Sequence, residues 1–162
     1  MKQKPEARNG KGERGLTLVE LIVAFSILLI LTTAVLPLAR VQVKREREHE
    51  LRYALRQMRE AIDRYKDAVD RGMIAGTKLG SEGYPPDLDT LVNGVNMVGQ
   101  TADKKMKFLR RIPLDPMTNS TDWGLRSMQD DPKSTSFGGQ NVFDVYTKSQ
   151  DTALDGSKYS EW

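Results

Sequence analysis

The chain has 162 residues, carries a formal net charge of +3 and contains no cysteine. Disulfides, thiol nucleophiles and cysteine metal sites are therefore excluded. The excess positive charge belongs to residues 1–15, which hold five basic and two acidic residues, while the rest of the chain is balanced. Because no basic patch interleaved with aromatic residues remains, we expect no binding of nucleic acid.

Residues 16–39 form an apolar segment of 24 residues that is interrupted by one acid, Glu20. As an α-helix this segment would be about 36 Å long, and the hydrocarbon core of a bilayer is about 30 Å thick. The length therefore predicts a transmembrane helix. A cleavable secretory signal is an alternative, although its apolar region is usually only about 7–15 residues long. A simple membrane anchor is a second alternative, and it leaves the acid unexplained.

The sequence after residue 40 predicts an amphipathic helix. Apolar side chains recur at spacings of three and four residues, which places them in one stripe along a helix. The stripe consists of Leu51, Leu55, Met58, Ile62, Tyr65 and Val69. Acid–base pairs at i, i+4, such as Glu48 with Arg52, favour the same helix. No glycine or proline lies between Ala39 and Leu51, so apolar segment and stripe can form one helix that ends near Arg71.

The remaining sequence is rich in turns and predicts short elements. A short helix is expected from about Asp87, and strands are expected over residues 123–128 and 141–147, where β-branched and aromatic residues gather. A helix followed by a few antiparallel strands is typical of an α+β domain, here residues 40–162. We expect Trp123 and Phe143 to lie in its core.

The sequence does not predict an enzyme. The only histidine, His49, lies in a run of charged residues, which favours a solvated helix face over a metal site. No Ser-His-Asp arrangement or phosphate-binding loop is present, so no nucleophile has a base beside it. No cofactor is expected to be required. These features point to a structural subunit.

The sequence "ERGLTLVE" around Gly15 and Leu16 resembles the processing site of type IV prepilins and type II secretion pseudopilins. That family has a short basic leader that ends in glycine, then an apolar run with an acid at its fifth position, here Glu20. The resemblance implies that residues 1–15 are a leader and that a prepilin peptidase cuts after Gly15. It also implies that the same peptidase methylates the new amino group of Leu16.

The resemblance also implies a role for Glu20 in assembly. Cleavage would place a positive amino group on Leu16 at the membrane edge, and an unpaired ion inside hydrocarbon costs at least a few kcal/mol. Leu16 and Glu20 are four residues apart, on one face if both are helical. In the family, the acid mainly meets the amine of an adjacent subunit. Such a pair sets the register between neighbouring helices.

Three further segments, "YPPDLDTLV", "FLRRIPLDP" and "FDVYTKSQD" with the terminal Trp162, are similar to the major pseudopilin of type II secretion. The resemblance implies a pilin-like α+β fold, in which a long N-terminal helix packs on a small C-terminal antiparallel sheet. The sequence departs from that family in two places. Residues 117–119 replace the family's usual Trp-Gly-Asn, and the terminal loop lacks the family's glycine- and acid-rich run.

This resemblance implies a single-pass protein of the bacterial inner membrane, anchored by residues 16–39, with residues 40–162 in the periplasm. Its function would be that of a structural subunit of a pseudopilus that drives protein export across the outer membrane. The implied partners are further copies in a helical filament, minor pseudopilins, the prepilin peptidase, and an inner-membrane assembly platform with its cytoplasmic ATPase. A type IV pilin for adhesion, motility or DNA uptake, and a tethered binding domain that does not polymerise, are the alternatives.

Asp151 and Asp155 are the candidate metal ligands, because the family's major subunit binds calcium in this loop. Calcium takes about six to eight oxygen ligands, and the loop has few acids. A C-terminal hook without metal, in which Asp155 and Gly156 form a turn, is therefore preferred over a calcium site.

Overall fold

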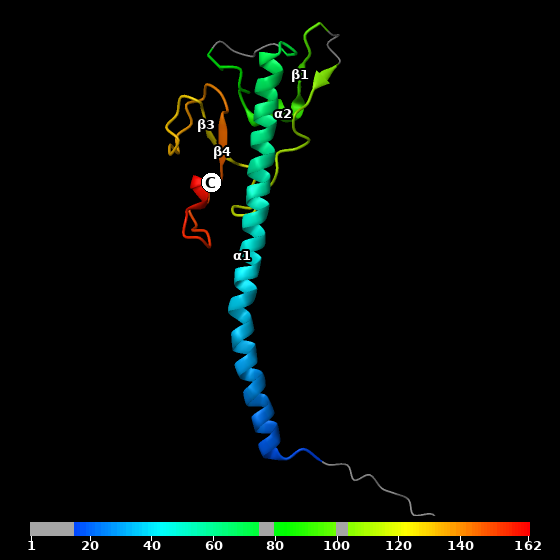
Figure 1. The fold of residues 1–162 in the computed structure, drawn as a ribbon, viewed down its shortest axis with the longest axis vertical. Helices are drawn as coiled ribbons and strands as arrows, with labels where there is room; N and C mark the ends of the chain where they lie inside the picture. Colours follow the sequence, from blue (N-terminus) through cyan, green and yellow to red (C-terminus); the bar gives the residue numbers. More distant parts are fainter. Residues whose placement is uncertain (1–14, 75–79, 100–103) are drawn as a thin grey trace, which may run out of the picture. The chain divides into compact units, whose positions relative to one another are not determined.

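The computed structural model describes residues 15–74, 80–99 and 104–162, with the backbone alone for residues 34–38. The chain divides into two compact units, Met1–Arg40 and Val41–Trp162, and each is described by itself. The expected leader, apart from Gly15, lies outside the described residues. In the described part of the chain the fold is α+β, with a long N-terminal helix and small antiparallel sheets (Figure 1).

Helix α1 spans Leu18–Asp70, so its predicted end near Arg71 is confirmed. Gly72 takes a left-handed φ of 65° just after the helix, a conformation that glycine adopts without steric cost. The Gly72 N–H donates to the Val69 carbonyl and the Met73 N–H to the Ala68 carbonyl, at 2.9 Å each. This pattern is the Schellman motif, which terminates helices at a glycine.

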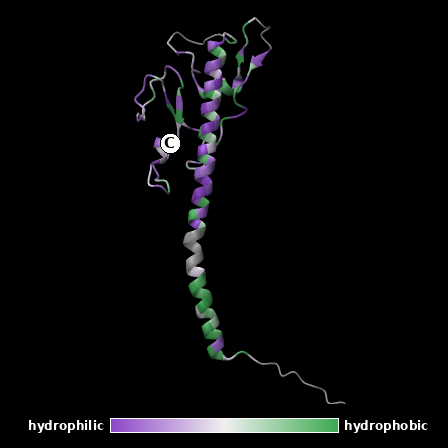
Figure 2. Cartoon of the chain, in the orientation of Figure 1, coloured by the Kyte–Doolittle hydropathy of each residue, from purple (hydrophilic) through white to green (hydrophobic). Residues whose placement is uncertain are grey.

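The beginning of α1 is mainly hydrophobic and its later part is mainly hydrophilic, as Figure 2 shows. Every large apolar side chain from Leu16 to Leu31 is exposed, by 46–76%. Within the described part of the chain, no helix is long and apolar enough to cross a membrane. The membrane span expected over residues 16–39 includes residues 34–38, whose side chains lie outside the description.

The core of the unit Val41–Trp162 is built on the predicted stripe of α1. Leu51, Met58, Ile62 and Tyr65 are fully buried and Leu55 is 2% exposed, which confirms the stripe. These side chains belong to one cluster with buried residues from several later parts of the unit. The cluster includes Ile74, Leu91, Leu109, Trp123, Val142, Val145 and Tyr159. Helix and strands therefore share a single core.

Helix α2, Leu88–Asn93, confirms the predicted short helix. The Asp87 side chain accepts a hydrogen bond from the Thr90 N–H at 2.7 Å and so caps the helix. Strand β1, Val95–Asn96, then pairs antiparallel with β2, Lys105–Met106.

Strands β3, Gly124–Arg126, and β4, Asp144–Tyr146, form a second antiparallel pair in which Leu125 faces Val145. Both lie within the predicted ranges but are shorter. The described residues thus form two two-stranded sheets where the sequence predicted one small sheet. A short 3₁₀ helix, η1, follows at Tyr159–Glu161.

Trp123 is buried at 4% exposure as predicted, and its Nε1–H donates to the Pro113 carbonyl at 2.9 Å. The prediction for Phe143 was wrong, because its side chain is 44% exposed. Regular pairing begins only at Asp144, so the alternation of a strand does not extend to Phe143. Val142 takes the core position instead, and Phe143 packs edge-on against Tyr84 at the surface.

We predict that residues 41–162 fold without the preceding segment, because every residue of the core lies within them. In this fragment Leu55→Asp should lower the free energy of unfolding by about 4 kcal/mol, since it buries an unpaired charge. Urea unfolding followed by circular dichroism measures the change. Tyr53→Asp is the matched control, because Tyr53 is 64% exposed on the same helix and should shift stability little. Equal midpoints for both variants would contradict the prediction.

Candidate assembly site and C-terminal segment

The first turn of α1 is capped by Thr17. The Thr17 hydroxyl accepts a hydrogen bond from the Glu20 N–H at 3.2 Å, and the Thr17 carbonyl accepts one from the Leu21 N–H at 3.1 Å. Thr17 is therefore the N-cap residue and Glu20 stands at the third helical position, which is the spacing of a capping box. The Thr-x-x-Glu pattern is the local sequence signal for a helix start at Thr17.

Glu20 lies in the first turn of α1 and has no ion-pair partner among the described residues. Its side chain is exposed, and no cation of residues 15–74, 80–99 and 104–162 forms an ion pair with it. A negative charge in the first turn is stabilised by the helix dipole. Leu16 precedes the helix and is 72% exposed, and a side chain added at Gly15 would meet no atom within 4 Å. The carboxylate and the expected cleavage site are both accessible.

The C-terminal segment, residues 150–162, is held against α1 by polar side chains of the helix. Lys44 Nζ donates to the Thr152 carbonyl at 2.6 Å. Glu48 Oε1 accepts hydrogen bonds from the Leu154 N–H at 2.8 Å and from the Tyr159 hydroxyl at 2.9 Å. Burial and the hydrogen bond to Glu48 raise the pKa of Tyr159 to about 12. Glu48 therefore binds this segment, and the predicted pair with Arg52 does not form.

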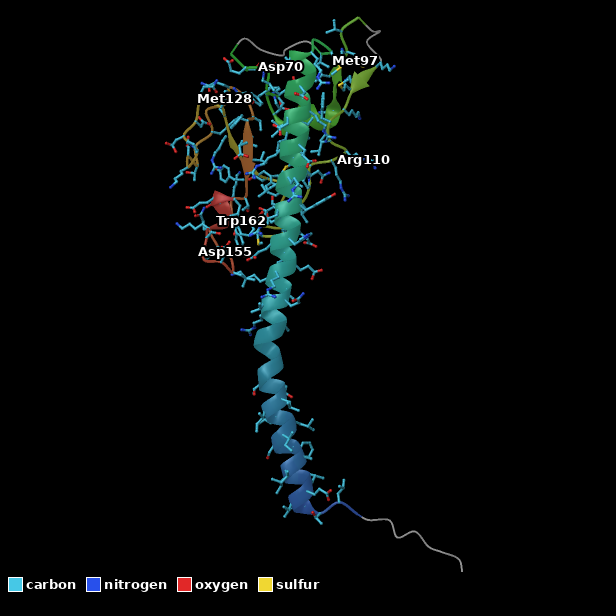
Figure 3. The ribbon with its side chains drawn as sticks, viewed as in Figure 1. Asp70, Met97, Arg110, Met128, Asp155 and Trp162 are labelled. Carbon is cyan, nitrogen blue, oxygen red and sulfur yellow. The ribbon has the colours of Figure 1, made fainter. Side chains whose placement is uncertain are left out.

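The C-terminal end of this segment contacts two arginines of α1. The Arg52 guanidinium lies 4.2 Å from the centre of the Trp162 ring, a cation–π arrangement. Arg59 Nη2 donates to the Trp162 carbonyl at 2.8 Å. Figure 3 labels Trp162 and Asp155 on this segment. Residues 44, 48, 52 and 59 thus form one row of contacts along the helix.

The two candidate metal ligands differ in their surroundings. Asp155 Oδ1 accepts hydrogen bonds from the Ser157 hydroxyl at 2.6 Å and the Ser157 N–H at 2.9 Å. These bonds, with Arg52 at 3.9 Å, lower the pKa of the Asp155 carboxyl. Gly156 has a φ of 88°, so the predicted turn is present. Asp151 contributes backbone hydrogen bonds, and its carboxylate is exposed.

Within the described residues, the side chains of this loop supply few of the oxygen ligands that a calcium ion needs. Among the described residues, no group of three or more His, Cys, Asp or Glu side chains is placed to hold a metal. One oxygen of Asp155 is already engaged by two donors of Ser157, whereas calcium takes about six to eight oxygen ligands. The contacts of α1 already hold the segment in place.

A network around Asp144 was missed by the sequence analysis. Asp144 Oδ1 lies 2.7 Å from Arg59 Nε, and Oδ2 lies 3.4 Å from Arg126 Nη1. Arg126 is 7% exposed and its guanidinium lies 4.0 Å from the centre of the Tyr146 ring. This carboxylate therefore joins α1 to the pair of β3 and β4. Arg59 and Arg126 carry no local sequence signal that would have revealed their shared acid.

Comparison with known proteins supports the N-terminal assignment. Residues 10–36 match the model of the prokaryotic N-terminal methylation motif. The matched range contains the expected cleavage site and Glu20, and this prepilin-type motif supports a type IV pilin-like subunit. No curated protein and no solved structure matches the chain.

We expect calcium to change the stability of the protein little, because Asp155 is engaged within its own turn. Thermal unfolding in calcium and in chelator should give midpoints within about a degree, since only a ligand that binds the folded form raises the midpoint. Asp151→Ala serves as the comparison. A rise of many degrees in calcium that disappears in Asp151→Ala would show a true metal site.

Proposed function

We propose that this chain is a structural subunit of a type II secretion pseudopilus. The subunit is cut after Gly15, is held in the inner membrane by residues 16–39 with its C-terminal unit in the periplasm, and polymerises to drive protein export. The observation that carries a pilin-like subunit is the methylation motif over residues 10–36. The apolar start of α1 lies in this range, and its acid, Glu20, forms no ion pair within the described residues.

The exposed first part of α1 supports polymerisation. Contiguous exposed apolar surface marks a contact with lipid or protein. The large side chains from Leu16 to Leu31 point outward all around the helix, so lipid can cover them before assembly and neighbouring helices afterwards. The same helix can then serve as anchor and as filament core.

The helix start supports a partner for Glu20 on another subunit. The i, i+4 relation that brings side chains together applies within a helix, and α1 begins only at Leu18. The Leu16 amine is therefore not held against Glu20 by the helix of its own chain. A carboxylate without a cation in an apolar segment favours pairing with the amine of a neighbour, which lowers the cost of burying both charges.

The three segments that resemble the major pseudopilin contact one another. The Phe108 and Leu109 N–H groups donate to the Leu91 carbonyl at 3.0 Å each, which joins the first segment to the second. The second meets the third where the Thr147 hydroxyl donates to the fully buried Asp115 carboxylate. One connected structural unit therefore contains all three segments, as a folded pseudopilin domain requires.

We predict that the mature protein begins at Leu16 with an N-methylated amino group, which mass spectrometry of the purified chain measures. Gly15→Ala should leave the leader attached, because the leader of the family that the sequence resembles ends in glycine at the cut. Among the described residues, apart from its chain neighbour, no atom lies within 4 Å of the added methyl group, so a failure would reflect recognition and not a disturbed fold. A chain that starts at Met1 or near Val35 would contradict the assignment.

We predict that Glu20→Ala and Glu20→Gln leave cleavage and membrane insertion intact but abolish filaments. Each variant brings an unpaired ammonium into an apolar core, and breaking a buried ion pair costs roughly 3 to 5 kcal/mol. The measurements are the yield of sheared fibres, the subunit in membranes, and export of secreted protein. Glu46→Ala is the control, because Glu46 is an exposed acid of the same helix. Normal fibres and export in Glu20→Ala would refute this role.

A further inference from the structure

A pocket of about 520 Å³ lies next to the loop between β3 and β4 and next to η1. Its lining is rich in cations and hydroxyl groups and has one acid. The residues concerned are Arg126, Lys133, Lys158, Thr135, Ser160 and Glu161. Small-molecule sites usually have volumes of about 300–1,000 Å³, so the space is large enough for a ligand of several polar groups.

Arg126 provides a fixed cation at this pocket. Its Nε donates to the Ser134 carbonyl at 3.0 Å, Nη2 donates to the Ser160 carbonyl at 3.2 Å, and Nη1 pairs with Asp144. A guanidinium has five N–H donors, so two remain available. The stacking of Arg126 on Tyr146 further restricts its orientation. A site built on such a side chain is ordered before any ligand arrives.

The charges around the pocket are not balanced. Arg126 is 7% exposed, yet its carboxylate partner Asp144 is shared with Arg59. Lys133 and Lys158 form no ion pair with any residue that the structure describes. Burying a charge that is not fully compensated is costly, so the surroundings of Arg126 favour the binding of an anion.

The hydroxyl groups add neutral donors to these cations. Thr135 and Ser160 line the same pocket, and neither hydroxyl makes a hydrogen bond within the described part of the chain. A phosphate monoester carries a charge of about −1.5 to −2 at pH 7 and has three strong acceptor oxygens. Arginine and lysine together bind such groups through charge-assisted hydrogen bonds. A single carboxylate would leave more of the positive charge and more donors unmatched.

We propose that this pocket binds a phosphate monoester carried on a sugar-sized molecule. Arg126 orients the phosphate, Lys133 and Lys158 neutralise it, and the two hydroxyls donate to its oxygens. The volume of the pocket leaves room for a sugar beside the phosphate. Glu161, which is exposed at the same pocket, repels the ligand and weakens binding. This site is separate from the assembly function and does not depend on it.

The test measures binding by calorimetry with the full chain in non-ionic detergent at constant ionic strength, because salt screens exposed charges. The probes are glucose 6-phosphate, inorganic phosphate and glucose. Glucose 6-phosphate should bind and glucose should not. The double variant Lys133→Ala/Lys158→Ala should weaken binding by at least roughly tenfold, and Glu161→Gln should strengthen it. Arg126 is left unchanged, because it also supports the fold.

Lys105→Ala is the control, since Lys105 is an exposed lysine of β2 outside the pocket lining and should leave binding unchanged. The lipid source of a phosphate is tested with short-chain phosphatidic acid against the matching phosphatidylcholine. Tighter binding of glucose 6-phosphate supports the sugar phosphate, and tighter binding of phosphatidic acid overturns it in favour of a lipid headgroup. Absence of binding to all phosphate probes, or binding that the double variant does not weaken, overturns the site.

Discussion

The burial of one stripe of α1 is the interaction on which the unit Val41–Trp162 depends. In the part of this unit that the structure describes, each of the two sheets has two strands, and a two-stranded sheet is at best marginally stable in water by itself. The strands become stable because buried residues such as Trp123 and Val145 join the cluster of Leu55, Met58 and Tyr65. A change that separates this stripe from the strands removes the support of both sheets at once.

The polar face of α1 is used for docking as much as for solvation. Lys44, Glu48 and Arg59 all bind backbone or side-chain groups of the C-terminal segment. These contacts hold the loop through groups of the chain itself. Arg59, on the same face, pairs with Asp144, which also pairs with Arg126. Arg59 therefore influences the charge at the pocket beside Arg126. Segment, sheet and pocket are therefore linked through one helix.

The first turn of α1 differs from the later turns, because its side chains are exposed and accessible to other molecules. Thr17 closes the start of the helix by capping, while Glu20 and the apolar side chains around it stay exposed. Exposed apolar surface is unfavourable in water, and an acid without a cation becomes unfavourable once it is buried in an apolar environment. Lipid or neighbouring copies can cover the apolar surface, and in the proposed filament a neighbouring copy also supplies a cation to the acid.

The sequence by itself determined the features that depend on neighbours within a few residues. The stripe from Leu51 to Tyr65, the cap at Asp87 and the methylation motif are local patterns, and a helix repeats every 3.6 residues wherever it lies. Only the tertiary structure decided the exposure of Phe143, the partner of Glu48 and the sharing of Asp144 by Arg59 and Arg126. These contacts join residues far apart in the chain, and spacing carries no information about which distant groups folding brings together.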